Sequence, residues 1–167
     1  VATRHLSGAP GAVARNNDYF QFARTPGVLM LDHDAEHVTD CFDRDSLRDA
    51  LLEVVPELEL APMLWRPSAS SRIYRSDTGE ELQGLRGQRL YIPVHDASDI
   101  QRLGKTIYTR LWAAGRGRFV VSGSGLLLDR NLFDNAVWKA EGLDYAAGAK
   151  CLPPLEQRRD PPHIWEA

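Results

Sequence analysis

The sequence predicts an α+β domain, with a mixed or antiparallel sheet and helices packed mainly on one side. Three observations lead to this fold class. The chain contains several short apolar runs typical of strands, only two segments with the period of an amphipathic helix, and turn residues between consecutive runs. The expected order of elements is roughly β-α-β-β-β-α-β-β.

The first two elements follow one another near the start of the chain. Residues 28–32 are apolar up to an aspartate and indicate a buried strand. A helix is expected over residues 46–55, where leucine, alanine and valine recur on one face. Asp43 or Asp45 can cap this helix, and Pro56 marks its end.

Three further strands are expected in the middle of the chain, over residues 63–65, 72–75 and 90–94. The Asp-Thr-Gly sequence at 77–79 indicates a turn after the second of them. The third, over residues 90–94, is strongly indicated.

The second helix and a final strand pair follow. Asp96 or Ser98 can cap a helix that ends near residue 114. Residues 119–121 and 126–128 indicate two strands around a Ser-Gly-Ser-Gly turn. These elements complete the expected α+β domain.

The sequence divides into three parts. Residues 1–24 are expected to be an N-terminal lead-in, which is small and polar over residues 1–18, while residues 25–150 are expected to form the main domain. Residues 151–167 are proline-rich and are expected to be an irregular tail that leads to further domains. The missing initiator methionine also favours a piece of a longer protein.

Length and composition are those of an ordinary globular domain. The chain has 167 residues, of which 43% are hydrophobic and 26% charged. No apolar stretch approaches the roughly 18 residues of a membrane span, and no signal peptide is evident. We therefore expect a cytoplasmic protein with no membrane partner. Cys41 and Cys151 lack metal-ligand spacing and are expected to be free thiols.

Charge is distributed unevenly along the chain. Residues 27–60 hold ten acidic and two basic side chains, whereas residues 84–130 hold eight basic and three acidic ones. A basic half facing an acidic edge suits a polyphosphate or nucleic-acid ligand. The alternative is that these arginines are mostly solvated surface.

Asp32 and Asp34 follow the first apolar run with one residue between them. Side chains alternate across a strand, so both carboxylates should project from the same face, with Cα atoms roughly 6–7 Å apart. Two carboxylates at this spacing can share divalent metals, and without metal they would repel one another. The pair indicates Mg²⁺ or Mn²⁺ chemistry on phosphates. The alternative is a strand end followed by a polar turn.

Two segments contain candidate phosphate ligands. Ser70, Ser71 and Arg72 follow a strand, and clustered hydroxyls with an arginine could hold a triphosphate. Arg89 and Tyr91 should share one face of their strand, next to glycines that allow a ligand to approach. The alternatives are a serine-rich loop and a hairpin with outward arginines.

A third carboxylate comes late in the chain. Asp129 ends an apolar run, as Asp32 does, and Asp134 follows it. Near the first acidic pair, either would complete a two-metal site of the polymerase kind. Strand-end geometry favours Asp129. Arg130 lies beside it and is a candidate phosphate contact, as are Arg116 and Arg118.

Three other motifs fit less well. The Gly-Lys-Thr sequence at 104–106 lies inside a predicted helix, and the P-loop pattern requires glycine where Asp99 stands. The His-Asp pair at 33–34 lies at a strand end, whereas metal phosphohydrolases of the HD type draw such ligands from helices. A toprim domain needs a glutamate on an earlier strand, and none precedes Asp32.

Taken in order, the motifs resemble the catalytic domain of the archaeo-eukaryotic primase superfamily, in the form carried by plasmids and integrated elements. The resemblance covers about residues 25–150, with motifs at 28–34, 84–94 and 126–134. One departure is Arg89, which stands where the family often has a histidine that contacts the nucleotide's phosphates. The resemblance implies an RRM-like primase catalytic core.

The resemblance also implies a nucleotidyltransferase that makes short primers from nucleoside triphosphates on a single-stranded DNA template. It implies Mg²⁺ or Mn²⁺ as the cofactor and a helicase domain or partner. The alternative is a catalytically degenerate DNA- or nucleotide-binding module of a larger helicase-type replication protein. The expected site residues are Asp32, Asp34 and Asp129 as catalytic metal ligands, Asp134 as a further metal ligand, and Ser70, Ser71, Arg72, Arg89, Tyr91 and Arg130 as substrate ligands.

Overall fold

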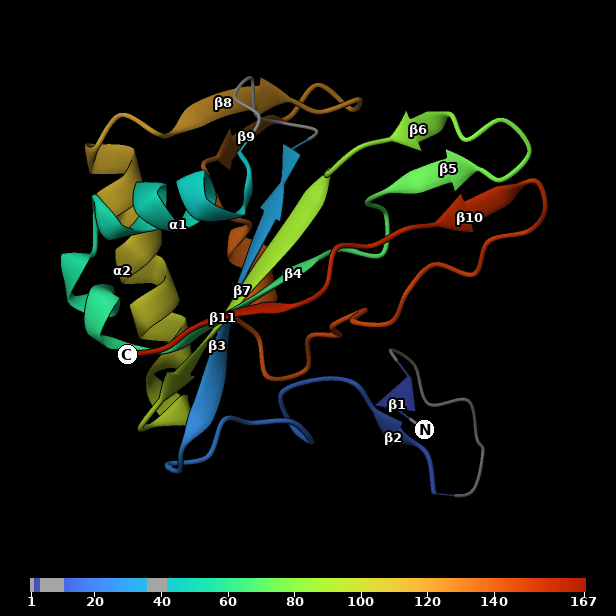
Figure 1. Ribbon diagram of the computed structural model, residues 1–167. Coiled ribbons are helices and arrows are strands. Elements are labelled where there is room, and N and C mark those ends of the chain that lie inside the picture. Colours follow the sequence, from blue (N-terminus) through green and yellow to red (C-terminus); the bar gives the residue numbers. More distant parts are fainter. Residues whose placement is uncertain (1, 4–10, 36–41) are drawn as a thin grey trace.

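A four-stranded sheet with helices on one face forms the centre of the molecule (Figure 1). The computed structural model describes residues 2–3, 11–35 and 42–167. The strand order is β11-β4-β7-β3, and every neighbouring pair is antiparallel. This confirms the α+β class. The elements are β3 (Gly27–Asp34), α1 (Arg44–Leu52), β4 (Met63–Pro67), β7 (Gly87–Val94), α2 (Ile100–Ala113) and β11 (His163–Trp165).

The core lies between this sheet and the two helices. Along β3, Leu29 and Leu31 are fully buried in the same cluster as the apolar faces of α1 and α2, while Met30 and Asp32 are turned to the opposite face. This opposite face is called the open face below. Other fully buried members of the core are Leu47, Leu51, Leu90, Leu111, Ile107 and Met63.

The predicted helix caps are present. The Asp43 carboxylate accepts a hydrogen bond from the Ser46 backbone N–H at 2.8 Å and caps α1. Pro56 begins a short 3₁₀ helix, Pro56–Leu60, just after it. Asp96 caps a second 3₁₀ turn, Ala97–Asp99, which continues directly into α2.

Smaller elements surround the central sheet. A three-stranded sheet, in the order β10-β5-β6, projects on the side away from the helices, and β8 pairs with β9 as a hairpin (Figure 1). The bounds are β1 (Ala2–Thr3), β2 (Val13–Ala14), β5 (Ile73–Arg75), β6 (Glu81–Gln83), β8 (Arg118–Val121), β9 (Leu127–Arg130), a 3₁₀ turn (Asn135–Val137) and β10 (Leu155–Gln157).

The structure differs from the sequence expectations at the C-terminal end of the chain and at the end of β9. Residues 151–167 are not irregular, because they contain β10 and β11, and β11 completes the central sheet. β9 extends to Arg130, so Asp129 lies within the strand and not at its end.

Cys151 is a free thiol, as expected, and Cys41 lies outside the described residues. In the described segments, neither helix has the length and apolar character needed to cross a membrane.

Candidate functional site on the open face

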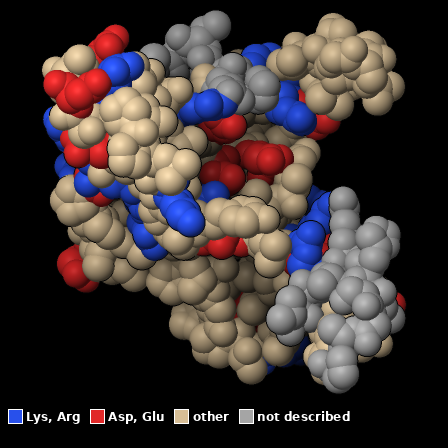
Figure 2. All heavy atoms as spheres, turned by 90° about the vertical axis from the view of Figure 1, so that its right-hand side faces the viewer, with Lys and Arg blue, Asp and Glu red and all other residues tan. Residues whose placement is uncertain are grey.

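Asp32 and Asp34 lie together on the open face at the end of β3, as predicted. Their side chains are 26% and 51% exposed. His33 is turned the other way, into the core, where it is fully buried. Figure 2, which looks at the molecule from this side, shows acidic side chains in a hollow with basic side chains on its rim. The His-Asp sequence therefore does not act as one ligand pair.

Arg89 is the partner of Asp32. The two residues are opposite one another in the β3–β7 register, and Arg89 Nε lies 3.4 Å from Asp32 Oδ1. Burial raises the pKa of the Asp32 carboxyl, and the positive charge of Arg89 opposes this effect. The negative charges of Asp134 and Asp34 raise the pKa of Asp32 further. The negative charges of Asp32, Asp34 and Asp134 thus lie close to the largely buried Arg89 side chain.

Asp134, and not Asp129, is brought next to the acidic pair. The Asp134 backbone N–H donates to the Asp32 carbonyl at 2.8 Å, and its carboxylate caps the following 3₁₀ turn through the Ala136 N–H. Asp129 instead accepts a hydrogen bond from the Tyr108 hydroxyl of α2 at 2.9 Å. The sequence favoured Asp129 because its apolar run was read as ending there, whereas β9 extends one residue further, to Arg130.

Asp144 connects Arg89 with Tyr91. Arg89 Nη1 donates to Asp144 Oδ1 at 2.5 Å and to the Tyr145 carbonyl at 3.0 Å, and the Tyr91 hydroxyl donates to Asp144 Oδ2 at 2.6 Å. Burial, reinforced by the Asp144 hydrogen bond, raises the pKa of Tyr91 to about 12. Tyr91 is therefore a hydrogen-bond donor throughout the physiological range.

Two arginines that the sequence did not single out extend this site. Arg66 of β4 donates to the Ala146 carbonyl at 2.7 Å, and Arg159 donates to the same oxygen at 3.4 Å. Strand alternation would have placed Arg66 on the open face beside Arg89. No local pattern identifies Arg159, which comes from the loop between β10 and β11.

The side chains of residues 70–72, which were predicted as phosphate ligands, bind other parts of the chain. The buried Ser71 hydroxyl donates to the Gly87 carbonyl at 2.9 Å and accepts from the Gly87 backbone N–H at 3.1 Å. The Ser70 hydroxyl bonds that of Ser68 at 2.9 Å. Arg72 pairs with acidic residues of β6 and of the loop after β10, namely Glu81 at 3.1 Å and Asp160 at 2.9 Å.

The other predicted basic contacts lie on the hairpin β8–β9 and just before it. Arg116 pairs with Glu53 at the end of α1. Arg118 and Arg130 are opposite one another in the hairpin, and Arg130 donates to the Asp129 carbonyl at 3.0 Å. In the described part of the chain, the ion pair of Arg116 is thus with α1 and the hydrogen bond of Arg130 is with the hairpin, and neither is with the acidic pair.

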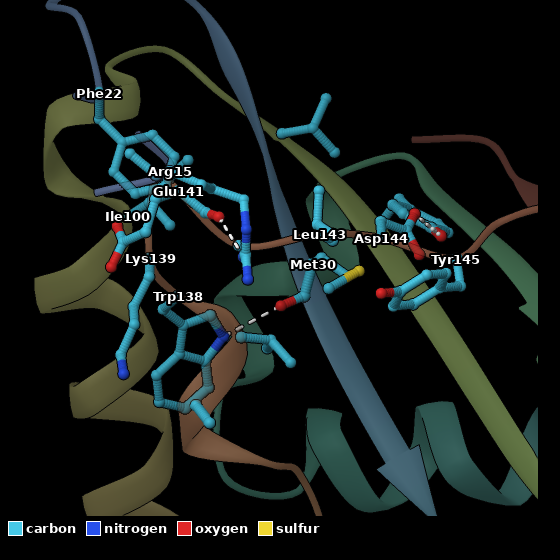
Figure 3. A pocket seen from close by; sticks show the side chains of 16 residues that line it. Arg15, Phe22, Met30, Ile100, Trp138, Lys139, Glu141, Leu143, Asp144 and Tyr145 are labelled. Atoms are coloured by element: carbon cyan, nitrogen blue, oxygen red, sulfur yellow. Dashed lines mark hydrogen bonds between the residues drawn. The ribbon is translucent and has the colours of Figure 1, made fainter. Parts of the chain in front are cut away.

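A cavity of about 580 Å³ opens beside Tyr91 and Asp144, which both line it (Figure 3). Its volume is within the range of small-molecule sites. Met30 and Trp138 form one wall, where the indole N–H donates to the Met30 carbonyl at 3.0 Å. Other lining residues are Phe22, Tyr145 and Arg15, which donates to the Glu141 carbonyl at 2.7 Å. Part of the expected lead-in therefore folds against the site.

Gly104 allows Trp138 to pack against α2. A Cβ atom at Gly104 would lie 2.2 Å from the indole ring, so only glycine fits in this arrangement. The Gly-Lys-Thr sequence thus has a packing role inside α2, consistent with its rejection as a P-loop.

The acidic pair has the donor chemistry of a magnesium or manganese site. Carboxylate oxygens are hard ligands, and Mg²⁺ is commonly held by one or two carboxylates together with substrate phosphates and water. Among the described residues, no three His, Cys, Asp or Glu side chains converge as a metal-binding group. Two carboxylates alone would leave the remaining coordination positions of such a metal to phosphate and water.

Comparison of the chain with models of protein families, with curated proteins and with solved structures finds no match.

Proposed function

We propose that this chain is the catalytic domain of a primase or primase-polymerase, which joins nucleotides into a short primer on single-stranded DNA during replication of a plasmid or mobile element. One observation carries the proposal. The open face of the sheet holds two carboxylates at the end of β3, beside a largely buried arginine and the uncharged hydroxyl of Tyr91. This combination suits metal-dependent chemistry on a phosphate.

The acidic residues bind the metal in this proposal. Asp32 and Asp34 supply oxygen ligands from one face of β3, and Asp134 contributes negative charge from the adjacent 3₁₀ turn. Bound Mg²⁺ or Mn²⁺ would activate the primer hydroxyl and neutralise charge on the triphosphate.

Arg89 and Tyr91 hold the phosphates. Arginine stays charged at every physiological pH and presents a planar fork that matches phosphate oxygens. Tyr91 adds a hydrogen bond without adding charge. The cavity next to them, with its apolar and aromatic wall of Met30 and Trp138, suits a base and sugar.

Primer synthesis with labelled nucleotides, a single-stranded DNA template and Mn²⁺ or Mg²⁺ tests the proposal. Asp32→Asn removes a metal ligand at constant size, and we expect synthesis to fall about 100-fold or more, because a metal supplies several kcal/mol of transition-state stabilisation. Asp99→Asn, at an exposed ion pair before α2, is the matched control. Unchanged synthesis by the Asp32 variant would reject the mechanism.

A second candidate is favoured by one observation. Arg89 and Arg86 already lie 3.4 Å and 4.0 Å from the carboxylates of Asp32 and Asp34. A face neutralised in this way suits a degenerate module that binds DNA or a nucleotide within a larger helicase-type protein. This candidate predicts binding of either ligand in EDTA and no release of pyrophosphate when Mn²⁺ is added.

A further inference from the structure

Three guanidinium groups converge on one short chain segment, residues 144–146. Arg66 comes from β4, Arg89 from β7 and Arg159 from the loop before β11. Together with the Tyr91 hydroxyl they donate hydrogen bonds to the Asp144 carboxylate and to the carbonyls of the next two residues. These three arginines are called the arginine cluster.

The arginine cluster carries more positive charge than this segment neutralises. Arg66 and Arg159 share the carbonyl oxygen of Ala146, which bears no formal charge. Burial lowers the pKa of Arg159, and the positive charges of Arg66 and Arg89 lower it further. Arg89 pairs with the Asp144 and Asp32 carboxylates, whereas Arg66 and Arg159 share only this carbonyl, so an anion with several charges would be better matched to the three guanidinium groups.

We propose that the arginine cluster binds the polyphosphate of a nucleotide, and that Asp144 occupies the cluster in the free protein as a carboxylate in place of a phosphate. This inference rests on the proposed function and deepens it, because it locates the triphosphate and identifies what the triphosphate must replace. Each arginine can then direct two N–H groups at phosphate oxygens, and Tyr91 supplies one more donor.

The segment is placed so that a ligand can displace it. Residues 142–146 belong to no helix or strand, and the side chains of Leu143 and Tyr145 are 54% and 68% exposed. The bonds that fasten the segment to the sheet come from Arg66, Arg89 and Tyr91. A polyphosphate that accepts from the same donors releases the segment.

Calorimetric titration with inorganic tripolyphosphate, in EDTA and without nucleic acid, measures this site alone. Asp144→Asn keeps the shape of the side chain but removes its charge, and we expect it to bind tripolyphosphate about tenfold more tightly, because the competing anion is gone. Arg66→Gln and Arg159→Gln should each bind about tenfold more weakly. The matched controls are Asp99→Asn and Arg102→Gln, whose wild-type side chains form an exposed ion pair at the start of α2, and both should bind as the wild type does.

Two results would overturn the inference. One is an unchanged tripolyphosphate affinity in both Arg66→Gln and Arg159→Gln, and the other is an unchanged or weaker affinity in Asp144→Asn. Arg159→Gln changes a loop residue and leaves the central sheet intact, so it remains informative if Arg66→Gln does not fold. Near-ultraviolet circular dichroism on every variant establishes that the fold is retained.

An oligothymidylate at equal phosphate concentration separates the two possible sources of phosphate. Binding of the oligonucleotide but not of tripolyphosphate to the arginine cluster would overturn the inference in favour of a nucleic-acid backbone. If primer synthesis fails while tripolyphosphate still binds, the proposed function is rejected and the inference about the arginine cluster is unaffected. The two proposals can therefore fail separately.

Discussion

Asp32 and Arg89 are directly opposite one another on neighbouring antiparallel strands, and the Arg89 guanidinium reaches the Asp32 carboxylate at 3.4 Å. The register of β3 and β7 fixes this pair. A slip of one residue in either strand would turn the charged side chain of that strand into the core and its buried leucines out of it, so the burial of these leucines disfavours the slip.

Arg89→Gln should change how activity depends on pH. Arg89 lowers the pKa of Asp32, so its loss raises that pKa, and more of the carboxylate is protonated in mildly acidic buffer. We expect the acidic limb of the pH–rate profile for primer synthesis to move to higher pH. Arg89→Lys keeps a charge and should shift the limb less. Superimposable profiles for wild type and Arg89→Gln would contradict the coupling.

Asp134→Asn should reduce primer synthesis more than Asp129→Asn does. Asp134 acts electrostatically on Asp32, whereas Asp129 binds the Tyr108 hydroxyl on α2. We expect a loss of about tenfold or more for the Asp134 variant, comparable with the loss of one electrostatic contact at a reacting phosphate. The opposite ranking would return the third-carboxylate role to Asp129.

His33 should make the fold sensitive to mild acid. It is buried, its Nδ1–H donates to the Leu132 carbonyl at 2.8 Å, and its Nε2 has no partner among the described residues. Burial lowers the pKa of the imidazole below its usual value of about 6.5. Between the two values the unfolded chain binds a proton that the native state does not, so stability rises with pH across this window and is lost as pH falls.

Thermal unfolding followed from pH about 7.5 to about 5 measures this effect. We expect the midpoint of wild type to fall more steeply than that of His33→Gln, which keeps a donor for Leu132 but does not titrate. Parallel curves would show that His33 titrates alike in both states.

Gly104→Ala should destabilise the domain although alanine is the better helix former. The new methyl group would meet the Trp138 ring at 2.2 Å, and overpacking of this kind costs about 1–3 kcal/mol, against roughly 1 kcal/mol gained in helix propensity. Chemical denaturation with tryptophan fluorescence measures the change. Gly123→Ala is the control, because its added methyl would contact nothing within 4 Å.

The sequence predicted the elements in which pattern and cap agree. β3, α1, β7 and α2 each combine a clear apolar period with a turn or capping residue at one end. β10 and β11 were missed because each has three residues, too few to show alternation, and prolines surround them. Their pairing partners, β5 and β4, are distant in the sequence.

The sequence predicted only those parts of the candidate site that lie close together within a single strand. Alternation of side chains along a strand places Asp32 and Asp34 on one face of β3, and Arg89 and Tyr91 on one face of β7. The sequence alone is enough to predict this. The approach of Asp144 and Arg159 depends on chain segments with no regular structure. The choice between the two later aspartates depended on where β9 ends, and strand ends are the least certain part of such predictions.

The late synthesis of β11 makes the domain prone to aggregate while the chain is being translated. The outer edge of β4 is covered only when β11 pairs with it, and β11 is translated long after β4, β7 and both helices. Until then a nascent or truncated chain presents an unpaired strand edge, which can pair with another copy and aggregate. Chains cut before His163 should therefore precipitate more readily than the full chain, even though all their catalytic candidates are present.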